Sequence, residues 1–122
     1  MMTSEVVIGE RCFRISALLR EGRWVATAER ADTGQRFGVE CAAETDAVAI
    51  ERLARWLEWQ DQHTRALEAL QQAERAYHRN VATDAFASGP GERTPLEVYR
   101  DSLEAVAQAR QRLDDIRAQR PL

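Results

Sequence analysis

The sequence predicts an α+β protein in which a small three-stranded antiparallel β-meander packs on a long helix and is followed by an antiparallel, coiled-coil-like helical hairpin. Three observations lead to this prediction. Residues 12–41 contain three short runs of strand-forming residues divided by turn residues, the chain then runs from Thr45 to Gly89 without Pro or Gly, and a second helical pattern begins at Pro95. We therefore expect residues 1–60 to hold the meander and the first half of the long helix, and residues 61–122 to hold the hairpin, with a loop at 83–93.

The meander is predicted from alternation and from turn residues. Apolar and polar positions alternate along the first strand, Glu21-Gly22 makes a tight turn into the second, and Asp32-Thr33-Gly34 makes a turn into the third. The apolar positions that share a face of the first and third strands are Phe13, Ile15, Ala17, Leu19, Phe37, Val39 and Cys41. Residues 6–8 offer a further short edge strand. Three strands with one apolar face are marginal in water, so this face needs a cover.

The long helix supplies this cover. Thr45 is its predicted N-cap, and Asp46 lies in its first turn. Apolar residues of the first half spread over a wide arc, which suits contact with a sheet on one side and a helix on another: Val48, Ile50, Leu53, Trp56, Leu57 and Trp59. Beyond residue 60 the apolar stripe narrows to Leu67, Leu70, Ala73, Tyr77 and Val81. A helix over residues 46–82 would be ~55 Å long, so its second half needs another partner.

The second helix is predicted from its start signal. In the run Thr94-Pro95-Leu96-Glu97 the threonine can cap the helix, the proline loses no hydrogen bond, and the glutamate can complete a capping box. Apolar residues then recur at spacings of three, four and seven: Leu96, Tyr99, Leu103, Val106, Leu113 and Ile116. The ~37 Å of this helix match the ~33 Å of the first helix beyond residue 60, which predicts an antiparallel pair. Two alternatives stay open for the loop: Phe86 folds back onto the end of the pair, or the tip is disordered.

Composition favours a folded, water-soluble protein without a strong electrostatic preference. The apolar fraction is 44% and the charged fraction 30%, as in globular proteins. All 17 basic residues are Arg, which we attribute to codon bias in a GC-rich bacterial genome. The net charge of −3 is spread evenly along the chain, so no segment is expected to attract nucleic-acid phosphate or anionic lipid. The first residues lack the pattern of a signal peptide or membrane span, and we expect a cytoplasmic protein with no membrane partner.

No group of residues in the sequence points to catalysis or to a cofactor. His63 and His78 lie on one helix without a second ligand at zinc-binding spacing, and we expect both to be surface residues. Cys12 and Cys41 have no redox-motif spacing, which favours reduced thiols in the core. The segment Gly89-Pro90-Gly91 follows no strand and lacks an N–H that a phosphate loop would use. We therefore expect no enzyme, no metal and no cofactor.

One part of the chain resembles the layout of known regulatory domains. The segments Gly22-Arg23-Trp24-Val25-Ala26, Thr33-Gly34-Gln35-Arg36-Phe37-Gly38 and Thr45-Asp46-Ala47-Val48-Ala49 resemble the strand-turn-strand-turn-strand-helix order of AP2 and integrase amino-terminal DNA-binding domains, and also that of HicB-type antitoxin domains. This resemblance covers about a third of the chain. It implies nucleic-acid contacts from the outer sheet face, on which Arg14, Arg23 and Arg36 would lie together with Glu29 and Glu40, two acids that oppose phosphate.

The preferred functional hypothesis is a non-catalytic protein–protein interaction or accessory module, which forms a homodimer or docks on a protein partner through the helical hairpin. Two helices cannot enclose a core, so their facing stripes should keep one side open to a partner. The interface candidates are Leu67, Leu70, Tyr77, Tyr99, Leu103, Val106 and Leu113. The alternative is a nucleic-acid-binding or antitoxin-like regulator that uses Arg14, Arg23 and Arg36 on the sheet.

Overall fold

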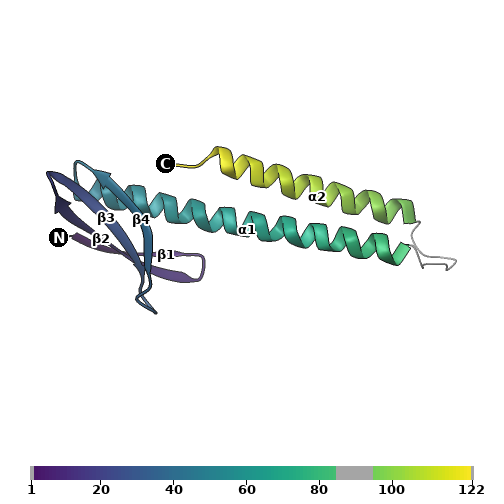
Figure 1. Ribbon diagram of the computed structural model, residues 1–122, viewed down its shortest axis with the longest axis horizontal. Helices are drawn as coiled ribbons and strands as arrows, with labels where there is room; N and C mark the ends of the chain where they lie inside the picture. Colours follow the sequence, from purple (N-terminus) through teal and green to yellow (C-terminus); the bar gives the residue numbers. More distant parts are fainter. Residues whose placement is uncertain (1, 85–94, 122) are drawn as a thin grey trace. The chain divides into compact units, whose positions relative to one another are not determined.

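The computed structural model describes residues 2–84 and 95–121 and has an α+β fold (Figure 1). Its elements are β1 (Met2–Ile8), β2 (Arg11–Arg20), β3 (Arg23–Arg30), β4 (Arg36–Ala43), α1 (Asp46–Asp84) and α2 (Pro95–Ala118). They form two compact units: one holds the sheet, α1 up to Asp61 and the C-terminal residues from Arg120, and the other holds Gln62–Gln119. None of the helices, over the residues that are described, is long and apolar enough to cross a membrane.

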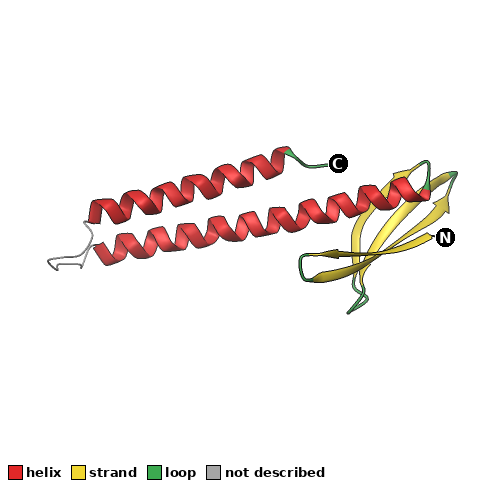
Figure 2. Cartoon of the chain, turned by 180° about the vertical axis from the view of Figure 1, so that it is seen from behind, coloured by secondary structure: helices red, strands yellow, loops and turns green. Residues whose placement is uncertain are grey.

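The sheet has four strands, so the prediction of three was wrong. The strands follow one another in the order β1-β2-β3-β4, and every neighbouring pair is antiparallel (Figure 2). The first strand is a full partner of β2, paired from Met2 opposite Ala17 to Ile8 opposite Arg11, rather than a short piece at residues 6–8. Residues 2–5 lack the apolar alternation of a strand, so the sequence pattern did not predict their pairing with β2.

The turn residues explain how this sheet folds back on itself. Glu21 and Gly22 both have positive φ angles, 51° and 81°, which is the backbone of a two-residue type I′ hairpin. A turn of this type matches the right-handed twist of the strands it joins. The predicted tight turn at these two residues is therefore present, and it sets the pairing of Arg20 with Arg23 and of Leu18 with Val25.

One face of the sheet and the start of α1 enclose the first core. Its buried residues are Ile8, Phe13, Ile15, Ala17, Ala26, Ala28, Cys41, Ala43, Ala49, Ile50, Leu53 and Leu57. Ile15 and Leu53 are fully buried, so a strand and the helix each contribute a side chain to its centre. Trp56 packs against this core from a half-buried position, and Trp59 is half-buried with the Arg120 guanidinium 5.6 Å from its ring centroid. Leu19, on the same face, is 62% exposed.

The start of α1 is capped as its sequence predicts. Thr45 Oγ1 accepts a hydrogen bond from the backbone N–H of Val48 at 3.2 Å, and the Arg52 guanidinium donates to the backbone oxygen of Ala42 at 3.0 Å. The first contact satisfies an N–H that has no partner within the helix.

We expect Thr45→Ala to lower the free energy of unfolding by about 1 kcal/mol, because the Val48 N–H loses its acceptor. Urea unfolding followed by circular dichroism measures this loss. The matched control is Thr64→Ala, an exposed position inside the same helix, where alanine's higher helix propensity should leave stability unchanged or slightly raised. Equal losses in both variants would contradict the capping role.

In the second unit, α1 and α2 lie side by side and run in opposite directions (Figures 1 and 2). His63 near the start of this part of α1 contacts Arg117, whereas Tyr77 near its end contacts Tyr99. The predicted loop at 83–93 begins later than expected, because Thr83 and Asp84 belong to α1. The predicted cap at Thr94 and the position of Phe86 lie outside the described residues.

Candidate interaction surface of the helix pair

The helix pair has a buried seam in which large and small side chains both take part. Its buried residues are Ala66 and Leu70 on α1 and Ser102, Leu113 and Ile116 on α2. Of the interface candidates, Leu70 and Leu113 lie in this seam, with 9% and 2% of their surface exposed. Leu67, Tyr77 and Val106 are half-buried, and Tyr99 and Leu103 are 37% and 44% exposed. Only part of the predicted set is therefore free to meet a partner.

Polar side chains connect the helices near Asp84 and Pro95. The Tyr77 hydroxyl donates a hydrogen bond to the Tyr99 hydroxyl at 2.8 Å, and their ring centroids are 5.4 Å apart. This hydrogen bond, followed by desolvation, raises the pKa of Tyr77 above its usual value, because donating the hydroxyl proton to Tyr99 favours the neutral form of Tyr77. The Asn80 side-chain amide donates to the hydroxyl of Ser102, which is 8% exposed. Every buried side-chain nitrogen and oxygen among the described residues has a hydrogen-bond partner.

One side of the pair is marked by an ion pair and by exposed apolar residues. Arg110 lies 4.0 Å from Glu74. Seven residues make two helical turns, so residues seven apart share a side of the helix. Leu67 and Val81 therefore share the side of Glu74, and Leu103 and Arg117 share that of Arg110. We call these six residues the open flank.

The open flank gathers the large apolar side chains that the pair leaves in water. In the described part of α1 beyond residue 61 and of α2, the exposed large hydrophobic residues are Val81, Tyr99 and Leu103. Val81 and Leu103 belong to the open flank, and Tyr99 lies one turn before Leu103 on the same side of α2. On the other side of the seam lie Ala69, Ala76 and Ala105, which we call the alanine flank. The two flanks thus differ in the apolar area they offer.

The sequence contained a signal for the open flank that our prediction missed. Val81 was not among the interface candidates, and neither were Glu74 and Arg110. The signal is the seven-residue spacing of Leu67, Glu74 and Val81 on one helix and of Leu103, Arg110 and Arg117 on the other. A search for apolar residues alone passes over these two rows, because Glu74 interrupts the first and Arg110 the second.

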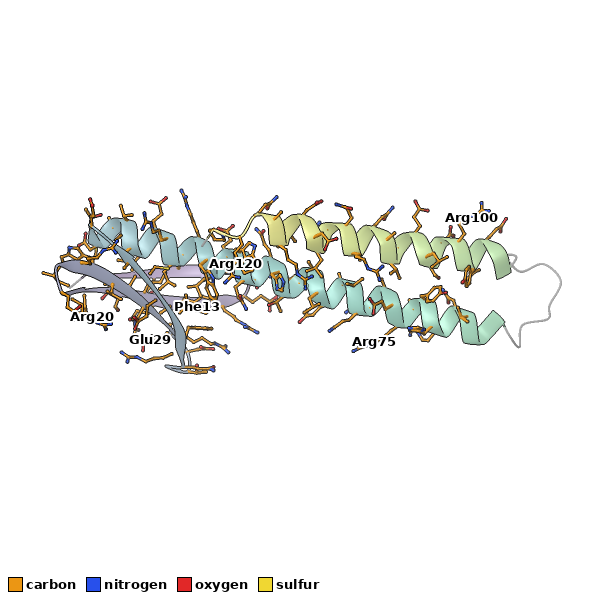
Figure 3. The ribbon with its side chains drawn as sticks, turned by 45° about the horizontal axis from the view of Figure 1, so that its top comes forward. Phe13, Arg20, Glu29, Arg75, Arg100 and Arg120 are labelled. Carbon is orange, nitrogen blue, oxygen red and sulfur yellow. The ribbon has the colours of Figure 1, made fainter. Side chains whose placement is uncertain are left out.

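The outer face of the sheet is the second candidate surface, and its charges largely compensate one another. Arg14 lies 3.2 Å from Glu29 and 3.9 Å from Glu5, and Arg20 lies 3.4 Å from Glu40. Arg36 is paired in register with Glu29, and Arg23 lies at the hairpin end opposite Arg20. Figure 3 shows Arg20 and Glu29 on the sheet. The three predicted contacts are therefore interleaved with carboxylates and do not form a continuous positive surface for phosphate.

The remaining polar residues offer little chemistry in the described part of the chain. No three His, Cys, Asp or Glu residues converge as metal ligands within residues 2–84 and 95–121. Burial raises the pKa of the Cys41 thiol, which makes it a poor nucleophile, and Cys12 is half-buried. An open depression of about 460 Å³ on α1 is lined by Gln72, Arg75, His78 and Arg79.

No family model, no curated protein and no solved structure matches the chain.

Proposed function

We propose that this chain is a non-catalytic interaction module that forms a homodimer through the open flank of its helix pair. The observation that carries the proposal is the position of Val81, Tyr99 and Leu103, the exposed large apolar residues of the described helix pair, on a single side. Two helices bury only the residues between them, and a second pair laid against this side would complete a four-helix bundle. A surface that pairs with itself is the usual basis of a two-fold homodimer.

The spacing of the seam supports an antiparallel coiled coil as the scaffold for this surface. Seam positions recur at steps of three and four on both helices: Ala66, Leu70, Ala73, Tyr77 and Asn80 on α1, and Tyr99, Ser102, Val106, Ala109, Leu113 and Ile116 on α2. In the register indicated by the contact of His63 with Arg117, Ala66 would face Leu113 and Leu70 would face Ala109. Such alternation of large and small residues lets two helices approach closely.

The size of the surface is adequate for a stable dimer. A helix of 24 residues is ~36 Å long, and two helices packed 8–10 Å apart present a face ~20 Å wide, so the side of the pair covers about 700 Å². Standard protein interfaces bury ~800 Å² per partner. The side chains of Glu74 and Arg110 lie between the apolar ends of the open flank, and their aliphatic parts add to the apolar area that a partner can cover.

We expect Leu103→Glu to weaken the dimer at least thirtyfold, or ~2 kcal/mol, because it places a carboxylate without a partner in an apolar contact. Light scattering coupled to size-exclusion chromatography measures the mass over a range of concentrations. The matched control is Ala105→Glu, which adds the same charge to an exposed position of α2 on the alanine flank and should leave the dimer intact. A monomeric mass for the unmodified protein at high micromolar concentration would overturn the proposal.

A further inference from the structure

We infer the orientation of the two copies: the helix pairs lie side by side with their Asp84 and Pro95 ends together, and α1 of each copy packs against α2 of the other. This inference rests on the proposed homodimer and adds to it the direction of the two-fold axis. It follows from the charges and apolar side chains of the open flank, taken in the order in which they occur along the helices.

A two-fold axis can relate two open flanks in two ways. When the axis runs along the helices, α1 of one copy lies over α2 of the other, and equal heights along the two pairs face each other. When the axis runs across the helices, α1 lies over the second α1 and α2 over the second α2, and the two pairs point in opposite directions. The two arrangements bring different residues together.

With the lengthwise axis, each residue of the open flank meets a residue of complementary charge or polarity on the other copy. The intrachain neighbours Glu74 and Arg110 lie at the same height, so each Glu74 would also face the other copy's Arg110. Two turns further along, Val81 would meet Leu103 of the other copy, and both are exposed in the single chain. At the opposite end Leu67 would meet the aliphatic stem of Arg117. Tyr99, held by Tyr77, would border the apolar level.

With the crosswise axis, residues of like charge on the two open flanks would face each other. Full overlap of the two pairs requires its centre to lie near the Glu74 and Arg110 level, which brings Glu74 against Glu74 and Arg110 against Arg110. Like charges in contact oppose association and select against this arrangement. Moving the centre to the Val81 and Leu103 level avoids these contacts, but the copies then overlap only at one end and bury a smaller area. Charge order therefore favours the lengthwise axis.

Three spin-label sites distinguish the arrangements in the full-length protein. Arg100, Ala107 and Asp114 are exposed, lie seven residues apart and share one side of α2, so labels attached there differ only in height along the helix. Arg100 points away from α1 (Figure 3). Each site is replaced singly by Cys in a Cys12→Ser, Cys41→Ala background, and the distance between the two copies' labels is measured by double electron–electron resonance.

With the lengthwise axis, the three distances should agree within ~5 Å, because the two labels of each pair lie at the same height along the helices. With a crosswise axis centred near Arg110, the two labels at position 100 are displaced along the helices by ~30 Å and those at position 107 by only ~9 Å. A distance ~15 Å longer at Arg100→Cys than at Ala107→Cys, or ~15 Å longer at Asp114→Cys than at the other two sites for a centre near Leu103, would overturn the orientation while leaving the homodimer in place. Absence of any coupling between copies, together with a monomeric mass, would overturn the homodimer itself and the orientation with it.

Discussion

Replacing Leu53 by Ala should lower the free energy of unfolding by about 4 kcal/mol. Leu53 is fully buried between α1 and the sheet, in a core that includes Ile15 and the small residues Ala17 and Ala26. Removing the isobutyl group forfeits its transfer free energy and leaves a cavity, and such changes cost ~2–5 kcal/mol. Leu53 has none of its surface exposed, so its whole side chain is replaced by a cavity, and the cost should lie in the upper part of that range.

The matched control for Leu53→Ala is Leu19→Ala, since the same atoms are removed from a side chain that is 62% exposed. That variant should lose less than ~1 kcal/mol, because most of its surface remains in water after folding. Both values come from urea unfolding monitored by tryptophan fluorescence and circular dichroism. A loss of similar size in the two variants would mean that α1 does not cover the sheet as described.

Leu113→Ala should lower the free energy of unfolding of the helix pair by about 3 kcal/mol. Leu113 is 2% exposed and lies in the seam between α1 and α2, where Ala66 and Ile116 are also buried. The loss should be smaller than that at Leu53, because a pair of helices can shift toward each other and partly close the cavity. Hydrogen exchange of the amides in α2, measured by mass spectrometry, reports the effect within this unit.

Protein concentration separates the seam from the proposed dimer surface. Leu113→Ala removes a contact within one chain, so its cost should be the same at low and high protein concentration. Leu103→Ala removes a 44%-exposed side chain, so its cost should be small in dilute solution and grow as the dimer forms. If the two variants show the same dependence on concentration, either the seam or the dimer surface is assigned incorrectly.

Local signals in the sequence predicted much of the fold. The N-cap at Thr45, the start of α2 at Pro95 and the turn at Glu21-Gly22 each depend on a few neighbouring residues, and the structure has the two helices and the turn at these positions. The first strand was underestimated because its formation depends on β2, a partner supplied by the later chain. The end of α1 was placed two residues early because threonine and aspartate have low helix propensity, although no Gly or Pro stops the helix at Thr83 or Asp84.

The candidate surface was harder to predict than the fold. Periodicity identified the residues that line the two helices, but it could not separate those that face the seam, such as Leu70 and Leu113, from Leu103, which faces water. That distinction depends on the rotation of each helix about its axis, and contacts such as Glu74 with Arg110 and Tyr77 with Tyr99 determine it. The same limit applies to Arg14, whose charge is compensated by Glu5 and Glu29 from neighbouring strands.

The hydrogen bond between Asn80 and Ser102 favours one alignment of α1 and α2 along their axes. Sliding α2 by seven residues would keep many apolar side chains in the seam, because the repeat of the sequence is preserved. It would also move Ala109 or Pro95 to the level of Asn80, and neither residue type has a side-chain atom that accepts a hydrogen bond from the amide. A shifted pairing would leave the half-buried Asn80 amide without its acceptor, so this hydrogen bond favours one alignment over the shifted ones that apolar packing alone would allow.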